Sequence, residues 1–148
     1  MNRLTDLVNE LTTYFLTRDA WRDWTPTVEQ SSPVTVTVAN ARYIVMGNLV
    51  IVNVKLDVTS AGIAANEIII SGQPTVIQPA HFGILVVIGN GIIHDDSGVI
   101  IYQGSLVASA ADEWKIYADG YGAAIGSTPS FALASGDRIS FTACFERS

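Results

Sequence analysis

From Val34 onward, apolar and polar residues alternate with a period of two, which is the pattern of a half-buried β-strand. The alternation is clearest at 34–38 and 50–58, where every second residue is aliphatic. Further short strands are predicted at 67–70, 82–88, 92–94, 99–107, 114–118 and 138–145. Turn-forming clusters separate them at 71–74, 89–91, 95–98 and 135–137. Gly47 and Asn48 predict a tight hairpin in which both residues take a positive φ.

The last predicted strand has a clear two-sided pattern. Ile139, Phe141, Ala143 and Phe145 alternate with Ser140, Thr142, Cys144 and Glu146. Because successive side chains of a strand point to opposite faces, the first set is expected in the core and the second on the other face of the sheet. Glu146 and Arg147 are expected near the surface.

A helical period occurs only between residues 2 and 19, where it predicts an amphipathic α-helix with Asn2 as its N-cap. Its apolar stripe consists of Leu4, Leu7, Val8, Leu11, Tyr14 and Phe15. A helix of this length is marginal alone in water, so the stripe needs a partner. Either it packs on its own β domain, or equivalent helices of several copies pack around a symmetry axis as a short coiled coil.

Many short strands at regular spacing, without a second helical pattern, favour an all-β fold. We expect a jelly-roll-like antiparallel β-sandwich preceded by a short N-terminal α-helix, with the helix in 1–23 and the sandwich in 24–148. Pro26 makes continuation of the helix past Trp24 unfavourable. The segment 119–130 is rich in Gly, Ala and Ser and predicts a long surface loop.

Charge narrows the possible partners. The chain has 14 acidic and 8 basic residues, for a formal net charge of −6, which argues against binding to the phosphates of nucleic acid. Only 15% of its residues are charged, below the roughly 25% of ordinary soluble domains, so we expect surface to be covered by other copies. No apolar run approaches the roughly 18 residues of a membrane span. Asp6, Glu10 and Asp19 interrupt any secretory signal, so accumulation in the cytoplasm is expected.

Metal and cofactor sites are not predicted. Cys144 is the single cysteine, which excludes an internal disulfide, and we expect it to be a small buried apolar residue of the last strand. His94, Asp95 and Asp96 form a metal-capable run, with His81 elsewhere. The run lacks the ligand spacing of a calcium loop and is interpreted as a solvated turn. Either histidine would bind a metal only if a symmetry axis brought copies together.

Catalysis is not predicted either. The chain contains no G-x-S-x-G elbow, no H-E-x-x-H pair and no Cys-His-Asn set. The carboxylates Glu67, Asp112, Glu113 and Asp119 could in principle supply a glycosidase pair, which requires two of them across a cleft. Acidic residues in turns are usually only solvated, so we interpret the protein as a non-enzyme.

Aromatic residues indicate a possible ligand surface. Trp114, Tyr117 and Tyr121 lie on and beyond one late strand, and such rings stack on sugars or dock against proteins. Trp114 opens a strand and could instead be a core or interface residue, whereas Tyr121 lies in the Gly-rich segment and is expected to be exposed. Trp21 and Trp24 are expected to fix the junction of helix and sandwich.

Three strings carry a resemblance to a known family: Trp24-Thr-Pro-Thr27, the segment 41–52 (ARYIVMGNLVIV) and the segment 136–145 (GDRISFTACF). They resemble the small β-sandwich heads of bacteriophage tail fibres, baseplate tips and head fibres, over a stretch from about Trp21 to the C-terminus. The resemblance implies a homotrimer that is made in the host cytoplasm and becomes part of the virion. It further implies attachment to other virion proteins through the N-terminal region and contact with a host surface glycan or protein.

Long fibres carry shaft repeats before the head, whereas a short helix is predicted here, which indicates a small accessory protein. Other classes share the expected architecture. A carbohydrate-binding lectin-like module would have the same sandwich and aromatic loops, and a capsule-degrading enzyme would need a carboxylate pair. Trimeric sandwiches of the tumour-necrosis-factor and C1q type resemble the strand pattern, although they usually carry secretion signals.

Overall fold

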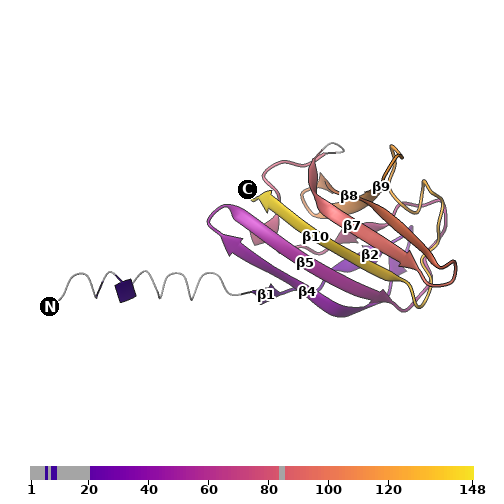
Figure 1. The fold of residues 1–148 in the computed structure, drawn as a ribbon, viewed down its shortest axis with the longest axis horizontal. Helices are drawn as coiled ribbons and strands as arrows, with labels where there is room; N and C mark the ends of the chain where they lie inside the picture. Colours follow the sequence, from indigo (N-terminus) through magenta and orange to yellow (C-terminus); the bar gives the residue numbers. More distant parts are fainter. Residues whose placement is uncertain (1–5, 7, 10–20, 84–85) are drawn as a thin grey trace.

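The computed structural model describes residues 6, 8–9, 21–83 and 86–148, and the chain from Arg22 onward is built of antiparallel β-strands (Figure 1). All-β architecture, as expected from the period of two, is therefore confirmed. The strands are β1 (Arg22–Asp23), β2 (Thr27–Glu29), β3 (Pro33–Val34), β4 (Val36–Met46), β5 (Leu49–Val58), β6 (Ile69–Ser71), β7 (Val87–Asp95), β8 (Ile100–Ala110), β9 (Glu113–Ala118) and β10 (Arg138–Glu146), with a 3-10 turn, η1 (Thr75–Ile77), between β6 and β7.

The strands form one continuous sheet rather than the two sheets of the expected jelly roll. Their order is β1-β4-β5-β10-β7-β8-β9-β6-β2-β3, and all the paired strands are antiparallel. β3 at one end and β4 near the other are consecutive in the chain, separated only by Thr35. The backbone N–H of Thr59 donates to the carbonyl of Thr35 at 2.9 Å and holds this bend. The sheet therefore curls until its two ends meet, and the prediction of a sandwich is wrong in this respect.

The core lies inside the curl and is centred on Trp114 of β9. Its ring is fully buried and packs edge-on against Trp24, Phe141 and Phe145, with centroid separations of 6.0, 6.0 and 5.7 Å. Edge-to-face packing at this spacing is favourable for aromatic quadrupoles. Because β9 and β10 are separated by two strands in the sheet order, these contacts run across the interior rather than along the sheet.

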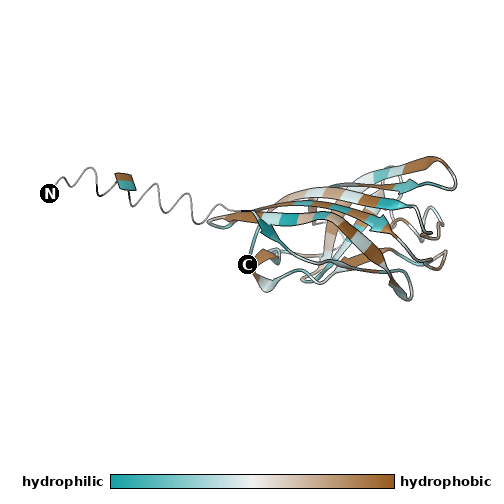
Figure 2. Cartoon of the chain, turned by 90° about the horizontal axis from the view of Figure 1, so that it is seen from below, coloured by the Kyte–Doolittle hydropathy of each residue, from teal (hydrophilic) through white to brown (hydrophobic). Residues whose placement is uncertain are grey.

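The two-sided pattern of the last strand is confirmed. Phe141 is buried opposite Val54 of β5, and the next residue, Thr142, is exposed opposite Asn53. The same alternation runs along β5, and Figure 2 shows it as changing hydropathy along the strands. Glu146 is exposed and Arg147 half-buried, as expected. Cys144 is exposed, so the prediction of a buried cysteine is wrong: it belongs to the outward-facing set.

The turn predicted at 89–91 does not form, because these residues lie inside the continuous strand β7. Gly91 faces the interior, where a Cβ would lie 2.6 Å from the side chain of Ile116. A Cβ on Gly89 would clash even more closely with the backbone carbonyl oxygen of Thr142. Glycine in a strand often marks such a close approach of backbones, and here it allows the sheet to curl. Local sequence does not distinguish glycines of a turn from glycines that allow close packing inside a strand.

Two smaller expectations also change. The hairpin at 47–48 forms, but only Gly47 has a positive φ, of 63°, as in a type II′ turn. The segment 119–130 lacks strands, as predicted for a loop. It does not lie wholly on the surface, because Ile125 within it is buried in the core, with 1% exposure.

The N-terminal helix falls almost wholly outside the described residues. Asp6, Val8 and Asn9 are described, and each is helical. Leu4, Leu7, Leu11, Tyr14 and Phe15, predicted for oligomerisation or anchoring, lie outside the described residues. Val8, from the same predicted stripe, is 51% exposed.

Candidate functional site

A polar row crosses the outer face of the central strands. Backbone register places Asn53 of β5 opposite Thr142 of β10, Thr142 opposite Asn90 of β7, and Asn90 opposite Ser105 of β8. Side chains directly opposite on one face of an antiparallel pair have Cβ atoms about 4.5–5.5 Å apart. The four polar side chains, called here the polar ladder, therefore form a continuous strip. The strip extends to Arg42 of β4 beside Asn53 and to Tyr117 of β9 beside Ser105.

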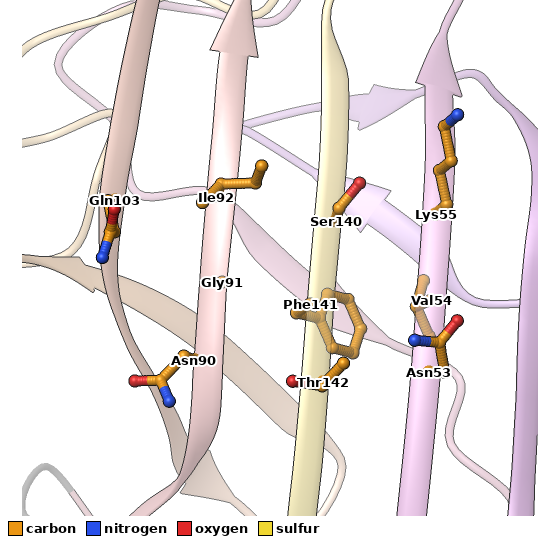
Figure 3. Close-up of a pocket in the computed structure, with 10 residues that line it drawn as sticks. All are labelled: Asn53, Val54, Lys55, Asn90, Gly91, Ile92, Gln103, Ser140, Phe141 and Thr142. Carbon is orange, nitrogen blue, oxygen red and sulfur yellow. The ribbon is translucent and has the colours of Figure 1, made fainter.

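Part of the polar ladder lines a shallow, open hollow of about 470 Å³ (Figure 3). A second row runs beside the ladder, two residues along each strand, and consists of Lys55, Ser140, Ile92 and Gln103. Figure 3 shows Asn53, Thr142 and Asn90 at one level of the hollow and the second row at the other. The inward-pointing Val54, Gly91 and Phe141 form the floor between the rows.

The side chain of Asn53 is oriented by a neighbour. Asn40 of β4 donates from Nδ2 to the side-chain oxygen of Asn53, and also to its backbone oxygen at 3.2 Å. A register shift between Val38 and Asn40 precedes this contact, and such bulges re-aim side chains. With its oxygen engaged, Asn53 keeps both N–H donors of its amide for another partner. Figure 3 shows its nitrogen on the side of Thr142.

The other polar side chains of the hollow are unengaged. Within the part of the chain that the structure describes, the side chains of Asn90, Gln103, Ser140 and Thr142 have no intramolecular hydrogen bond. Amides and hydroxyls of this kind both donate and accept. The hollow thus presents several donors and acceptors at fixed spacing on a rigid sheet.

The charged side chain that lines the hollow is positive, whereas the whole chain has a net charge of −6. Lys55 is the charged residue among those lining the hollow, and it has no ion pair with any described residue. At the end of the ladder, the guanidinium of Arg42 lies 4.8 Å from the ring centre of Trp21, a cation–π contact. Asp57 lies farther along β5, but its carboxylate is 3.6 Å from Nε of Arg138. The hollow is therefore locally positive in a chain of net charge −6.

The three aromatic residues predicted for ligand contact occupy different environments. Trp114 is fully buried in the core and is not available to a surface ligand, in line with the alternative role considered for it. Tyr117 is half-buried on β9 and lies opposite Ser105, at the end of the ladder. Tyr121 is 54% exposed in the turn after β9. Trp24 is buried, whereas Trp21 is 44% exposed, so only Trp24 belongs to the core.

The carboxylates considered for hydrolysis do not line the hollow, although the backbone N–H of Asp119 donates to the carbonyl of Gln103 at its rim. Glu67 accepts a hydrogen bond from Lys115 Nζ at 2.7 Å, and Glu113 lies 4.0 Å from the same nitrogen. Burial lowers the pKa of Lys115, but the hydrogen bond and charge of Glu67, with the charge of Glu113, outweigh it, so the pKa is raised overall. Asp112 and Asp119 are exposed. None of the four lines the hollow.

His94 and Asp95 are the last two residues of strand β7, and Asp96 begins the β7–β8 turn. The prediction of a solvated turn therefore holds for Asp96 but is wrong for Asp95, which is buried. Asp95 accepts from the N–H of Gly98 and the hydroxyl of Ser97, both at 2.8 Å, and these bonds lower its pKa. The described residues contain no group of three metal-binding side chains. His94 lies opposite Arg138 at the start of β10, whereas Ala80, next to His81, bonds to Glu146 at its end. The two histidines of one chain are therefore far apart along β10.

The polar ladder is not predicted from the sequence, although Asn53, Ser105 and Thr142 stand in predicted strands. Asn90 falls in the segment 89–91, for which a turn is predicted. The available signal was that Asn53, Asn90 and Thr142 are uncharged polar residues where charged ones are more usual. Their juxtaposition depends on the register between strands that are distant in the chain, since Thr142 pairs with both Asn53 and Asn90, and the sequence does not show this register.

Comparison with known proteins finds no match: no family model, no curated protein and no solved structure is significantly similar to the chain. Among the described residues, no helix has the length and apolar character needed to cross a membrane.

Proposed function

We propose that this protein is a non-catalytic structural and binding component of a bacteriophage particle, in which it forms a homotrimer and contacts the host surface. The observation that carries the proposal is the hollow on the outer face, with its unengaged amides and hydroxyls. A side chain that folding leaves without a partner on a rigid surface is available for recognition. The phage context rests on the resemblance of 24–27, 41–52 and 136–145 to fibre and baseplate heads.

The composition of the hollow favours binding over catalysis. The described residues that line it include no aspartate, glutamate, histidine or cysteine, the groups that most often act as acid, base or nucleophile. Glu67 and Glu113 lie 2.7 and 4.0 Å from Nζ of Lys115, and neither lines the hollow.

Self-assembly is supported by an exposed aliphatic tip on the β7–β8 hairpin. Val99, Ile100 and Ile101 are consecutive, with exposures of 83, 45 and 62%. Contiguous apolar surface on a soluble protein often marks a contact with another chain. In the proposed trimer, the predicted helix between residues 2 and 19 precedes β1, and its apolar stripe packs around the symmetry axis or anchors the protein to other virion proteins.

Light scattering of the purified full-length protein tests the assembly. We expect a mass three times that of the 15.8 kDa chain at micromolar concentration. Ile101→Ser should weaken assembly if the hairpin tip takes part, and Leu11→Ser should do so if the helix takes part. Thr128→Ser, on the exposed part of another loop, is the matched control. A monomer mass for the unmodified protein would contradict the trimer.

The virion context has its own test. Mass spectrometry of purified particles of the phage that encodes this chain should detect the protein in stoichiometric amounts. A particle without it, combined with glycan binding by the free protein, would favour the second candidate, a lectin-like carbohydrate-binding module. The same hollow supports that candidate, since its side chains suit sugar hydroxyls.

A further inference from the structure

The chemistry of the hollow specifies the kind of ligand it suits. Asn90 and Gln103 each offer a donor and an acceptor, and Ser140 and Thr142 each offer a hydroxyl that does both. A ligand that only accepts, such as an isolated phosphate, would leave the amide oxygens without partners. Sugar hydroxyls donate and accept, and they are closely spaced around a ring. A polyhydroxylated ligand therefore satisfies the hollow most completely.

The position of the hollow argues against an extended peptide. Peptide strands add to the exposed edges of sheets through their main chain. The hollow instead lies on the face of β5, β10, β7 and β8, which are central in the sheet order and paired on both sides. A ligand there contacts side chains only. Ile92, 39% exposed among the polar groups, offers an apolar contact of the sort that the C–H face of a sugar ring accepts.

Charge refines the ligand class. Lys55 projects from the second row with its ammonium unpaired among the described residues, and Arg42 lies at the end of the ladder. Among the residues that the structure describes, no acidic one lines the hollow. An unpaired cation beside neutral amides and hydroxyls complements a ligand that carries negative charge among many hydroxyls. Because the remainder of the chain is acidic, such a ligand would be attracted to this face in preference to others.

We propose that the hollow binds an acidic oligosaccharide, with the carboxylate of a uronic or sialic acid beside Lys55 and neighbouring sugar hydroxyls on Asn53, Thr142 and Asn90. This inference rests on the proposed function only in that the protein is a binding protein. It does not require a virion or a trimer. Asn53 has a defined role, because Asn40 holds its amide oxygen and directs its N–H groups to the sugar.

An array of defined saccharides, probed with the full-length protein, tests the class of ligand. It should contain oligouronates, sialylated oligosaccharides and neutral oligosaccharides of the same length, so that the source of the carboxylate is distinguished. We expect binding to one acidic class and about tenfold weaker binding to neutral saccharides, as for loss of one charged hydrogen bond. Absence of binding to every acidic saccharide at millimolar concentration overturns the proposal.

Titration calorimetry of variants with the best acidic saccharide then tests the residues. Lys55→Gln should weaken binding about tenfold and reduce its dependence on salt, since surface charge is screened by ions. Thr142→Val should weaken the binding of acidic and neutral saccharides alike, because it removes the hydroxyl while keeping the shape of the side chain. Asn40 does not line the hollow, but it holds the amide of Asn53. Asn40→Ala should therefore weaken binding indirectly, by releasing the side chain of Asn53.

Two variants serve as controls, Arg147→Gln for the loss of a positive charge and Thr128→Val for the loss of a hydroxyl, both outside the hollow. Each should leave affinity within about twofold, as for residues remote from a site. Acidic saccharides that bind equally well to Lys55→Gln and Thr142→Val would place the site elsewhere and overturn the proposal. Light scattering separates the two ideas: a monomer that binds saccharide contradicts the trimer alone, and a trimer that binds none contradicts this inference alone.

Discussion

The two faces of the curled sheet are made by the same strands and differ in how completely their side chains are satisfied. On the inner face of β10, Phe141 packs edge-on against Trp114 in a closed core. The side chain of the next residue, Thr142, has no hydrogen-bond partner among the described residues and lines the hollow. Stability therefore resides in one set of alternate residues and the proposed recognition in the other. Substitutions on the outer face should change binding with little effect on folding.

Two glutamines show the same contrast between a side chain with hydrogen-bond partners and one without. Gln30 is fully buried, and its Nε2 donates to the carbonyls of Asn66 at 3.1 Å and Phe131 at 2.6 Å. Its Oε1 accepts from the N–H of Leu133 at 2.9 Å. Gln103 in the hollow makes none of these intramolecular bonds. A buried amide needs hydrogen-bond partners within the protein, whereas an exposed amide can bond to water or to a ligand.

The largest expected effect compares neighbours on β10. Phe141→Ala should reduce the free energy of unfolding by about 3–5 kcal/mol, because it empties a packed aromatic site. Thr142→Ala should change it by less than about 0.5 kcal/mol, as usual for surface positions. Urea denaturation measures both. Equal losses would mean that both faces are covered in the assembled protein.

A somewhat smaller effect is expected for the buried amide. Gln30→Leu leaves a buried N–H and two carbonyls without partners, and each orphaned group costs about 1–3 kcal/mol unless water replaces the lost bond. We expect a loss of about 2–4 kcal/mol in urea denaturation, which allows for some rescue by water. Gln103→Leu, the matched exposed change, should be near neutral for folding. If Gln30→Leu proved harmless, the network would not be needed to hold the 124–133 segment.

At the tip of the β7–β8 hairpin, a substitution is expected to raise the stability of the protein rather than lower it. Val99 has a φ of 52°, a left-handed conformation that is unfavourable for a β-branched residue. Val99→Gly should relieve that strain and raise stability by about 1 kcal/mol, less than the full cost of the conformation because glycine adds freedom to the unfolded chain. Ile101→Gly, in the adjoining strand, should destabilise instead. Thermal unfolding of the two variants measures the difference, and loss of stability in Val99→Gly would show that the valine makes a compensating contact.

The smallest effect concerns pH. The pKa of Asp95 lies below its ordinary value of 3.8, so its stabilising contribution is complete above that value and is lost as pH falls through the lower, folded-state pKa. The raised pKa of Lys115 acts in the other direction: its contribution is complete below 10.5 and is lost as pH rises through the folded-state pKa. Melting temperatures of Asp95→Asn should therefore depend less on acid than those of the unmodified protein. Asp119→Asn, on an exposed turn, controls for the loss of one charge. Equal acid dependence in Asp95→Asn and the unmodified protein would contradict a role for the β7–β8 turn.

Much of the local structure was predictable. The alternation at 50–58 and 138–145 correctly indicated which residues of β5 and β10 face the core, and the glycine at 47 correctly indicated a hairpin. The candidate site was less accessible to prediction. Tyr117 and Tyr121 were placed near a surface, but Trp114 is in the core, and the ladder of Asn53, Thr142 and Asn90 was missed.

The sequence by itself therefore determined the all-β class and the inward or outward direction of side chains along each strand, because a strand's alternation depends only on neighbouring residues. Tertiary structure decided the rest. The glycines of β7 lie inside a strand rather than a turn, because β10 and β9 pack closely against them. The two ends of the sheet met because β3 and β4 are one bent segment, and the polar ladder arose because hydrogen bonding between distant strands set their register.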